Sequence, residues 1–102
     1  MWTFTRTDSD KPAERLIFRV RPGAIKTIGR APRADFIVDA ALVSRLHCRI
    51  EAGDEAIVVV DLNSTNGTYV NGARVSRAKI GGGDRLRVGR VELTLAKQRG
   101  KR

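Results

Sequence analysis

Three short segments of the sequence carry side chains suited to binding an anion. Gly29-Arg30 follows an apolar stretch, Ser44-Arg45-Leu46-His47 opens an alternating stretch, and Asn63-Ser64-Thr65-Asn66-Gly67-Thr68 lies between two apolar stretches. Each has an ordinary explanation: a strand-end glycine with a solvated arginine, a polar strand entry, and an Asx turn. Together they supply guanidinium, hydroxyl and turn amide donors, which are the groups that a phosphate dianion needs.

The remaining chemistry does not indicate a catalytic site. The chain has one histidine, His47, and one cysteine, Cys48. Neighbouring residues on a strand point to opposite faces, so these two cannot form a Cys-His pair with each other. A single cysteine excludes an intramolecular disulfide and a thiolate-rich zinc site. We therefore expect Cys48 to be a core residue, and we expect no enzymatic activity, metal or cofactor.

Short strands must position these segments. Leu16, Phe18 and Val20 fall on one face of a strand, and apolar and polar residues alternate in residues 46–50 and 91–95. Residues 56–60 form a β-branched run expected of a strand covered on both sides. Asn71-Gly72 predicts a two-residue hairpin, because a type I′ turn needs positive φ at both central positions. No window shows a helical stripe. The sequence therefore predicts an all-β sandwich or barrel.

Length and composition fit one globular domain. The chain has 102 residues, of which 41% are hydrophobic and 30% charged. A domain of this size buries roughly two-thirds of its unfolded surface, which provides a core but no deep cavity, so we expect any site at the rim. We divide the chain into a flexible N-terminal arm (1–15), the domain proper (16–95) and a basic C-terminal tail (96–102).

The charge balance favours an anionic partner. Twenty Lys and Arg residues stand against eleven Asp and Glu, for a net charge of +9. Phosphate, nucleic acid, an acidic protein face and a membrane surface all fit this charge. The longest apolar run, residues 56–60, is far too short to span a bilayer, and the N-terminal region has no stretch of signal-peptide length. We therefore predict a cytoplasmic protein without membrane contact.

Taken in order, the three segments resemble the forkhead-associated (FHA) domain family. The hallmarks of that family are Gly-Arg, Ser-x-x-His and an Asn-Gly preceded by Ser-Thr, and all three occur here in the family's order. The segment from Val60 to Gly72 resembles an unusually full version of the third motif. The resemblance covers residues 16–95 and leaves both ends outside.

The resemblance implies a sandwich of about eleven strands with its binding loops at one end. It also implies that the domain binds phosphothreonine in partner proteins, in signalling, without catalysis. Five residues would form the phosphopeptide site. Arg30 would contact the phosphate, Ser44 would donate its hydroxyl to it, Arg45 would add a cation or a peptide contact, Thr65 would face the phosphate, and Asn66 would hold the peptide main chain.

Four further residues have roles implied by the same resemblance. His47 would brace the binding loop from below. Gly29 would allow Arg30 its direction, and Gly67 would permit the backbone turn. Leu42, two residues before Ser44, lies where the loop selects the peptide's downstream side chain, and its apolar character argues against an acidic preference there.

Two other functions remain as alternatives. The net charge and the basic tail fit a nucleic-acid-binding β-domain, although the five aromatic residues are not interleaved with basic ones. A scaffold that binds proteins independently of phosphate is the second alternative. Within the FHA interpretation, a further hypothesis is that Thr3, Thr5 or Thr7 becomes phosphorylated and that the arm then docks into the domain's own loops.

Overall fold

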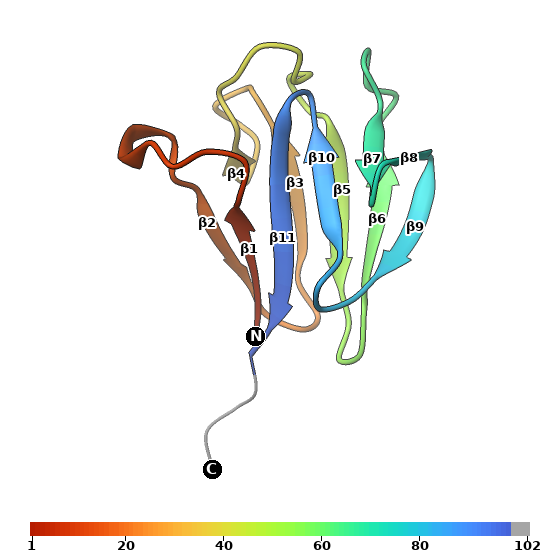
Figure 1. The fold of residues 1–102 in the computed structure, drawn as a ribbon. Coiled ribbons are helices and arrows are strands. Elements are labelled where there is room, and N and C mark those ends of the chain that lie inside the picture. Colours follow the sequence, from red (N-terminus) through yellow and green to blue (C-terminus); the bar gives the residue numbers. More distant parts are fainter. Residues whose placement is uncertain (99–102) are drawn as a thin grey trace.

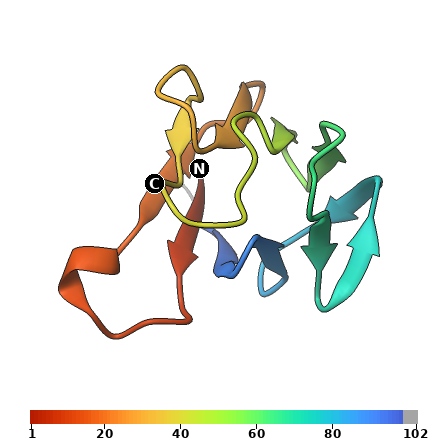
Figure 2. The same cartoon turned by 90° about the horizontal axis from the view of Figure 1, so that it is seen from above.

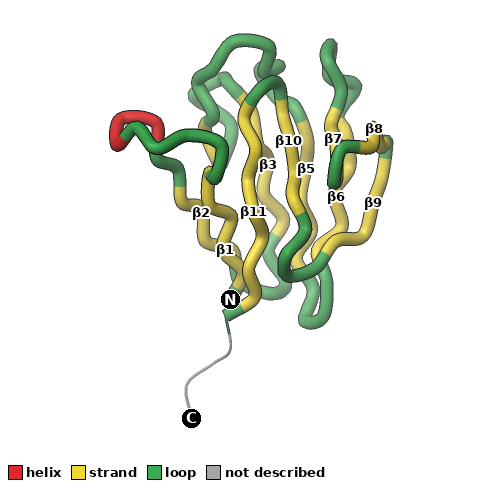
Figure 3. The backbone as a smooth tube through the Cα atoms, viewed as in Figure 1, coloured by secondary structure: helices red, strands yellow, loops and turns green. Residues whose placement is uncertain are grey.

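The structure, a computed structural model, describes residues 1–98 as two β-sheets packed face to face (Figure 1). Eleven strands hold about half of these residues, and one short 3₁₀ helix, η1 (Pro12–Glu14), lies between the first two strands (Figure 3). The all-β sandwich of about eleven strands expected from the sequence is confirmed.

The first sheet has six strands: β1 (Trp2–Arg6), β2 (Ile17–Val20), β7 (Thr68–Val70), β8 (Ala73–Val75), β10 (Arg85–Val88) and β11 (Val91–Lys97). Their order is β2-β1-β11-β10-β7-β8. The second sheet has five: β3 (Ile25–Gly29), β4 (Phe36–Ile37), β5 (Cys48–Ala52), β6 (Ile57–Asp61) and β9 (Arg77–Ile80). Their order is β4-β3-β5-β6-β9, and only the β3–β4 pair is parallel.

The alternation in the sequence determines which residues enter the core. In β10, Leu86 and Val88 are buried while Arg85 and Arg87 point outward, as the period of two along a strand requires. The inner faces of both sheets contribute in this way, and the largest fully buried apolar side chains are Trp2, Phe4, Ile28, Ile50, Ile57, Leu86, Leu93, Leu95, Val20, Val38 and Val59.

Two strand predictions have opposite outcomes. Asn71 and Gly72 have φ of 49° and 87° and join β7 to β8, which confirms the hairpin. The run at residues 56–60 was expected to be covered on both sides, and this is wrong. In β6, Ile57 and Val59 face the core while Val58 and Val60 are only half-buried, because no further layer covers the outer face of the second sheet within the described residues.

The predicted flexible arm of residues 1–15 is wrong in its first part. Trp2–Arg6 forms β1, which lies between β2 and β11 in the first sheet. Trp2 and Phe4 are 1% and 0% exposed, and the Trp2 indole donates a hydrogen bond of 2.8 Å to the carbonyl of Gly53. Thr3 and Thr5, which alternate with these aromatic residues, favour a strand although they are polar, so the domain includes β1 and does not start at residue 16.

The hypothesis of a mobile phosphorylated arm is therefore wrong for Thr3 and Thr5, and only Thr7 lies outside the strand. Thr3 is 7% exposed, and Thr5 belongs to a strand paired on both sides, so neither can reach the loops without dismantling the sheet. Thr7 lies just beyond β1, where its hydroxyl bonds to that of Thr94 at 2.9 Å.

The predicted basic tail of residues 96–102 is also partly wrong. β11 continues to Lys97, and the N–H of Gln98 donates to the carbonyl of Met1 at 2.8 Å. These residues therefore belong to the sheet, because the first strand provides backbone partners for them. The rest of the predicted tail, residues 99–102, lies outside the described residues.

The two loops that carry the candidate motifs lie at the same end of the sandwich. Loops 38–47 and 62–67 both lie at the end opposite the start of β1 and the last residues of β11 (Figure 1). Seen from above, loop 38–47 crosses from the second sheet towards the first (Figure 2). The topology thereby places residues about 20 positions apart along the chain beside one another.

Candidate functional site

Arg30 follows the last residue of β3 and is fixed to loop 38–47 by its backbone and side chain. Its N–H donates to the carbonyl of Ser44 at 3.0 Å, and its guanidinium Nε donates to the carbonyl of Val43 at 3.0 Å. The Nε bond leaves the two terminal nitrogens of the exposed guanidinium as donors for a ligand. A fork oriented in this way before binding suits an anion.

Gly29 supports this arrangement by its size. A Cβ at this position would overlap the carbonyl of Arg45 in the facing loop. We predicted that Gly29 is structural because it gives Arg30 its direction, but the structure gives a different reason. The two backbones approach so closely that no side chain fits between them.

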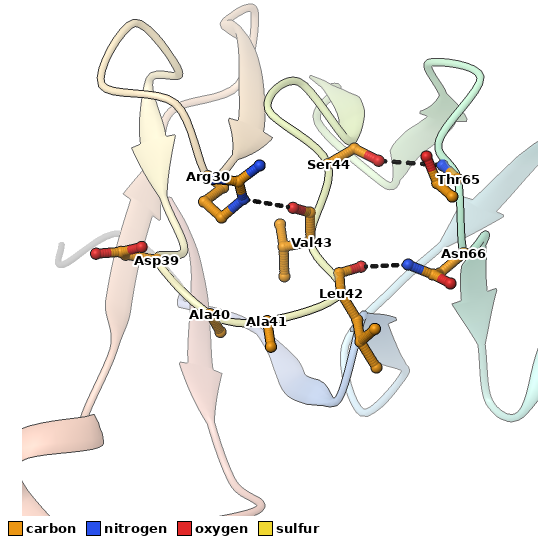
Figure 4. Close-up of a pocket in the computed structure, with 9 residues that line it drawn as sticks. All are labelled: Arg30, Asp39, Ala40, Ala41, Leu42, Val43, Ser44, Thr65 and Asn66. Carbon is orange, nitrogen blue, oxygen red and sulfur yellow. Dashed lines mark hydrogen bonds between the residues drawn. The ribbon is translucent and has the colours of Figure 1, made fainter.

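Several hydrogen bonds join loop 38–47 to loop 62–67, and two of them involve side chains that line the space between the loops. The N–H of Thr65 donates to the Ser44 hydroxyl at 3.1 Å, and the side-chain amide of Asn66 donates to the carbonyl of Leu42 at 3.0 Å (Figure 4). Because the Ser44 oxygen accepts from Thr65, its own hydrogen can be donated to a ligand. Leu42 has a φ of 71°, an unfavourable conformation for a residue with a side chain.

An open pocket of about 500 Å³ lies between these loops. Its lining residues are Arg30, Asp39, Ala40, Ala41, Leu42, Val43, Ser44, Thr65 and Asn66. Asp39 lies at the side remote from Ser44 and Thr65 (Figure 4). The structure therefore brings together Arg30, Leu42, Ser44, Thr65 and Asn66 from the sequence prediction. Arg45, also predicted, is exposed beside the pocket and is not part of its lining.

His47 connects both loops from beneath. It is 0% exposed; its Nδ1 accepts from the N–H of Ser44 at 3.0 Å, and its Nε2 lies 2.8 Å from the carbonyl of Gly67. Because Nδ1 accepts, Nε2 must carry the hydrogen and donate to Gly67, which assigns the neutral Nε2–H tautomer. The predicted position of His47 beneath the loop agrees with these contacts.

Asp61 at the end of β6 organises the second loop, a role that the sequence reasoning missed. Its carboxylate accepts from the Ser64 and Thr68 hydroxyls, each at 2.6 Å, and from the Ser64 N–H at 3.1 Å. Burial works to raise the pKa of Asp61, but these hydrogen bonds outweigh it and hold the pKa below its ordinary value. The spacing Asp-x-x-Ser before a glycine turn is the sequence signal that could have identified it.

The loop ends at Gly67, whose N–H donates to the Ser64 hydroxyl at 3.0 Å. Its φ of 92° is accessible to glycine without strain, in agreement with the predicted backbone turn. A Cβ here would also lie 2.7 Å from the Nε of Arg74 on β8. The Arg74 side chain therefore covers Gly67 from the outer face of the first sheet.

Other kinds of site receive no support from residues 1–98. Cys48 is fully buried, and burial raises the pKa of its thiol to about 12, as expected of an unreactive core residue. No group of three His, Cys, Asp or Glu side chains in this part of the chain could hold a metal ion. Over the same residues, no helix has the length and apolar character needed to cross a membrane.

Fold and pocket together define a class of small β-sandwich domains that bind ligands through loops at one end. The sequence pattern of the FHA domain matches residues 26–89, which is more than half of the chain. The chain therefore belongs to the FHA domain family.

Relatives within larger proteins support this assignment. An ABC transporter ATP-binding/permease protein of Mycobacterium tuberculosis is 38% identical over 82 residues, which cover 80% of this chain and 9% of that protein. The glycogen accumulation regulator GarA of the same species is 39% identical over 70 residues, or 69% of this chain and 43% of GarA. The chain thus matches less than half the length of these relatives.

Solved structures share this fold. The FHA domain of FhaA, complexed with the intracellular domain of Rv3910, is similar with a TM-score of 0.81 and 33% identity, covering 93% of this chain and 99% of that one. A second structure, from work on phosphothreonine-dependent FHA domain interactions, has a TM-score of 0.83 and 32% identity, covering 96% of this chain and 97% of that one.

Proposed function

We propose that this chain is a phosphothreonine-dependent protein-protein interaction module that binds phosphorylated partner proteins in signalling. The main support is the convergence of the Arg30 guanidinium, the Ser44 hydroxyl and Thr65 on one open pocket. A phosphothreonine carries a charge of about −1.5 to −2 and three strong acceptor oxygens, which this donor set complements. The similarity to FHA domains with phosphothreonine-dependent interactions supports the same function.

In this proposal the pocket residues have separate tasks. The terminal nitrogens of Arg30 bind phosphate oxygens while Nε stays on Val43. Ser44 donates its hydroxyl to the phosphate, and Thr65 faces the same group. Asn66 holds the main chain of the bound peptide through the amide oxygen that its bond to Leu42 leaves available.

The surrounding residues position these groups or extend the contact. Gly29, His47 and Gly67 hold the two loops at their present separation. Arg45 contacts the peptide from the side of the pocket, and the exposed Leu42 meets a downstream apolar side chain of the peptide. The proposed activity is binding without catalysis, and we propose the cytoplasm as its location.

Replacing Arg30 with alanine tests the proposal. We expect the affinity for a phosphothreonine peptide to fall by about 2 kcal/mol or more, roughly thirtyfold, because the phosphate loses a charge-assisted partner. Arg33→Ala is the matched control, since Arg33 is an exposed arginine nearby that does not line the pocket. Isothermal titration calorimetry measures both, with thermal unfolding as the check on folding. Equal affinities for the two variants would refute the assignment.

A second experiment compares phosphothreonine and phosphoserine peptides. A phosphoserine peptide of the same sequence should bind about fourfold more weakly, because burial of one methyl group contributes about 0.8 kcal/mol. Equal binding of the two peptides would mean that the site recognises phosphate alone.

A further inference from the structure

An arginine-rich surface lies on the outer face of the first sheet, next to the pocket. It consists of Arg74 on β8, Tyr69 on β7, and Arg85 and Arg87 on β10, and we call it the arginine face. Strand register places Arg87 opposite Tyr69 and Tyr69 opposite Arg74, so the three side chains form one row across three strands. Arg85 lies two residues from Arg87 and therefore shares its face of the sheet.

The arginines of this face are not neutralised by the protein. None of the salt bridges among residues 1–98 involves Arg74, Arg85 or Arg87. The Arg87 guanidinium lies 4.1 Å from the centre of the Tyr69 ring and donates to the carbonyl of Gly89 at 3.1 Å, which holds it against the sheet. Glu92 lies opposite Arg87 in the register, but no salt bridge joins the two, and three cations beside one carboxylate leave a local excess of positive charge.

This face continues directly from the candidate site. The Arg74 side chain lies against Gly67, the residue that follows Asn66 of the pocket lining. Figure 1 shows β7, β8 and β10 below loop 62–67. A polypeptide that leaves the pocket across Gly67 therefore meets Arg74 first and then the rest of the row.

We propose that the arginine face binds an acidic segment of the same partner protein that inserts its phosphothreonine into the pocket. This proposal rests on the proposed function. The row from Arg74 to Arg87 crosses two strand spacings, about 10 Å, which about three extended residues span. Three or four Asp or Glu residues beside the phosphothreonine therefore match the three arginines in both charge and length.

The geometry favours an acidic peptide over a nucleic acid. Single-stranded nucleic acids use open aromatic rings as stacking platforms, whereas the ring of Tyr69 is covered by Arg87. Glu92 on β11 lies directly opposite Arg87 in the register and limits the positive surface to a narrow area. A long phosphate backbone would meet this carboxylate, while a short acidic segment ends before it.

Peptide pairs and matched variants test the proposal. The first peptide is a short phosphothreonine peptide, and the others add four glutamates or four glutamines to it, at either end. For the wild-type protein we expect the glutamate extension at one end to raise affinity about tenfold over the glutamine extension, from three exposed ion pairs. The variant Arg74→Gln/Arg85→Gln should lose this gain and bind the short peptide as the wild type does.

The control removes two cations from the other side of the molecule. Arg77→Gln/Lys79→Gln changes β9 residues paired with Val60 and Val58 on the outer face of the second sheet. This variant should retain the gain in affinity from glutamate. A loss of that gain here would mean that affinity depends on the net charge of the protein and not on the arginine face. Calorimetry at fixed ionic strength measures all combinations, and duplex DNA is titrated in parallel.

Each contrary outcome has a distinct meaning. Failure of wild-type protein to bind the short peptide would refute the proposed function and this inference with it. Binding of the short peptide without any gain from glutamate would overturn the inference alone. An equal loss of gain in both double variants would also overturn it, in favour of net charge. Tight DNA binding that needs Arg74 and Arg85, without any glutamate gain, would assign the face to nucleic acid.

Discussion

His47 provides the most informative perturbation of the site. Its imidazole is the shared partner of the Ser44 N–H and the Gly67 carbonyl, which belong to the two loops around the pocket. In His47→Ala both groups lose that partner. His47 is fully shielded from solvent and does not line the pocket. The substitution therefore measures the effect of losing the two hydrogen bonds that join the loops, without removing a contact to the ligand.

The expected magnitude follows from these two bonds. A buried polar group left without a partner costs about 1–3 kcal/mol, and removal of the ring adds the loss of its packing contacts. We expect the free energy of unfolding of His47→Ala to fall by about 3–5 kcal/mol, a large part of the total for a small domain. Phosphopeptide affinity should fall as well, since Ser44 and Asn66 are no longer held in place.

Two conservative variants separate the bonds. In His47→Asn the amide oxygen replaces Nδ1 as acceptor for Ser44, and in His47→Gln the amide nitrogen replaces Nε2 as donor to Gly67. Each variant should recover part of the stability that is lost in His47→Ala. Urea unfolding measures the stabilities, and calorimetry below the unfolding transition measures peptide affinity. A loss below about 1 kcal/mol for alanine, or no recovery in either amide variant, would refute the bracing role.

Two further predictions concern Asp61 and β1. Since hydrogen bonds hold the pKa of Asp61 below its ordinary value near 3.8, its carboxylate stabilises the fold above that pH, and the contribution disappears as the pH falls through the lowered value. Urea unfolding should therefore find Asp61→Asn less stable than wild type at neutral pH, with a smaller difference near pH 3; an unchanged difference would contradict this. Phe4→Ala should cost about 3–5 kcal/mol of stability, because this fully buried ring packs in the core, whereas the control Thr5→Ala should cost under about 1 kcal/mol. Equal, small losses in thermal or urea unfolding would mean that β1 is dispensable.

The sequence predicts the fold wherever a strand shows a clear period. The alternation in β5 and β11 and the turn at Asn71-Gly72 are local signals, and each appears in the structure as expected. The sequence analysis missed β1 because only Trp2 and Phe4 carry its apolar pattern, and the alternating Thr3 and Thr5 resemble a polar arm. A strand at a chain end is defined by its neighbours, here β2 and β11, which no local pattern encodes.

The candidate site divides in a similar way. The side chains of Arg30, Ser44 and Asn66 are visible in the sequence because their types suit an anion and a peptide. The groups that orient them are mostly backbone atoms, such as the Val43 carbonyl that holds Arg30, and any residue type supplies a carbonyl. The reason for Gly29 likewise depends on the approach of a distant loop, so it emerges only in three dimensions.

The antiparallel pairing of β1 with β11 determines how the domain responds to mechanical force. Trp2 lies opposite Lys97, so the outer ends of the two strands emerge side by side. A force that separates these ends breaks the hydrogen bonds between β1 and β11 one residue pair at a time, in an unzipping geometry. It does not load all of these hydrogen bonds at once, as a shearing force would. The residue pair at Trp2 would therefore separate first. The loops around the pocket lie at the far end of the sandwich and would be displaced last.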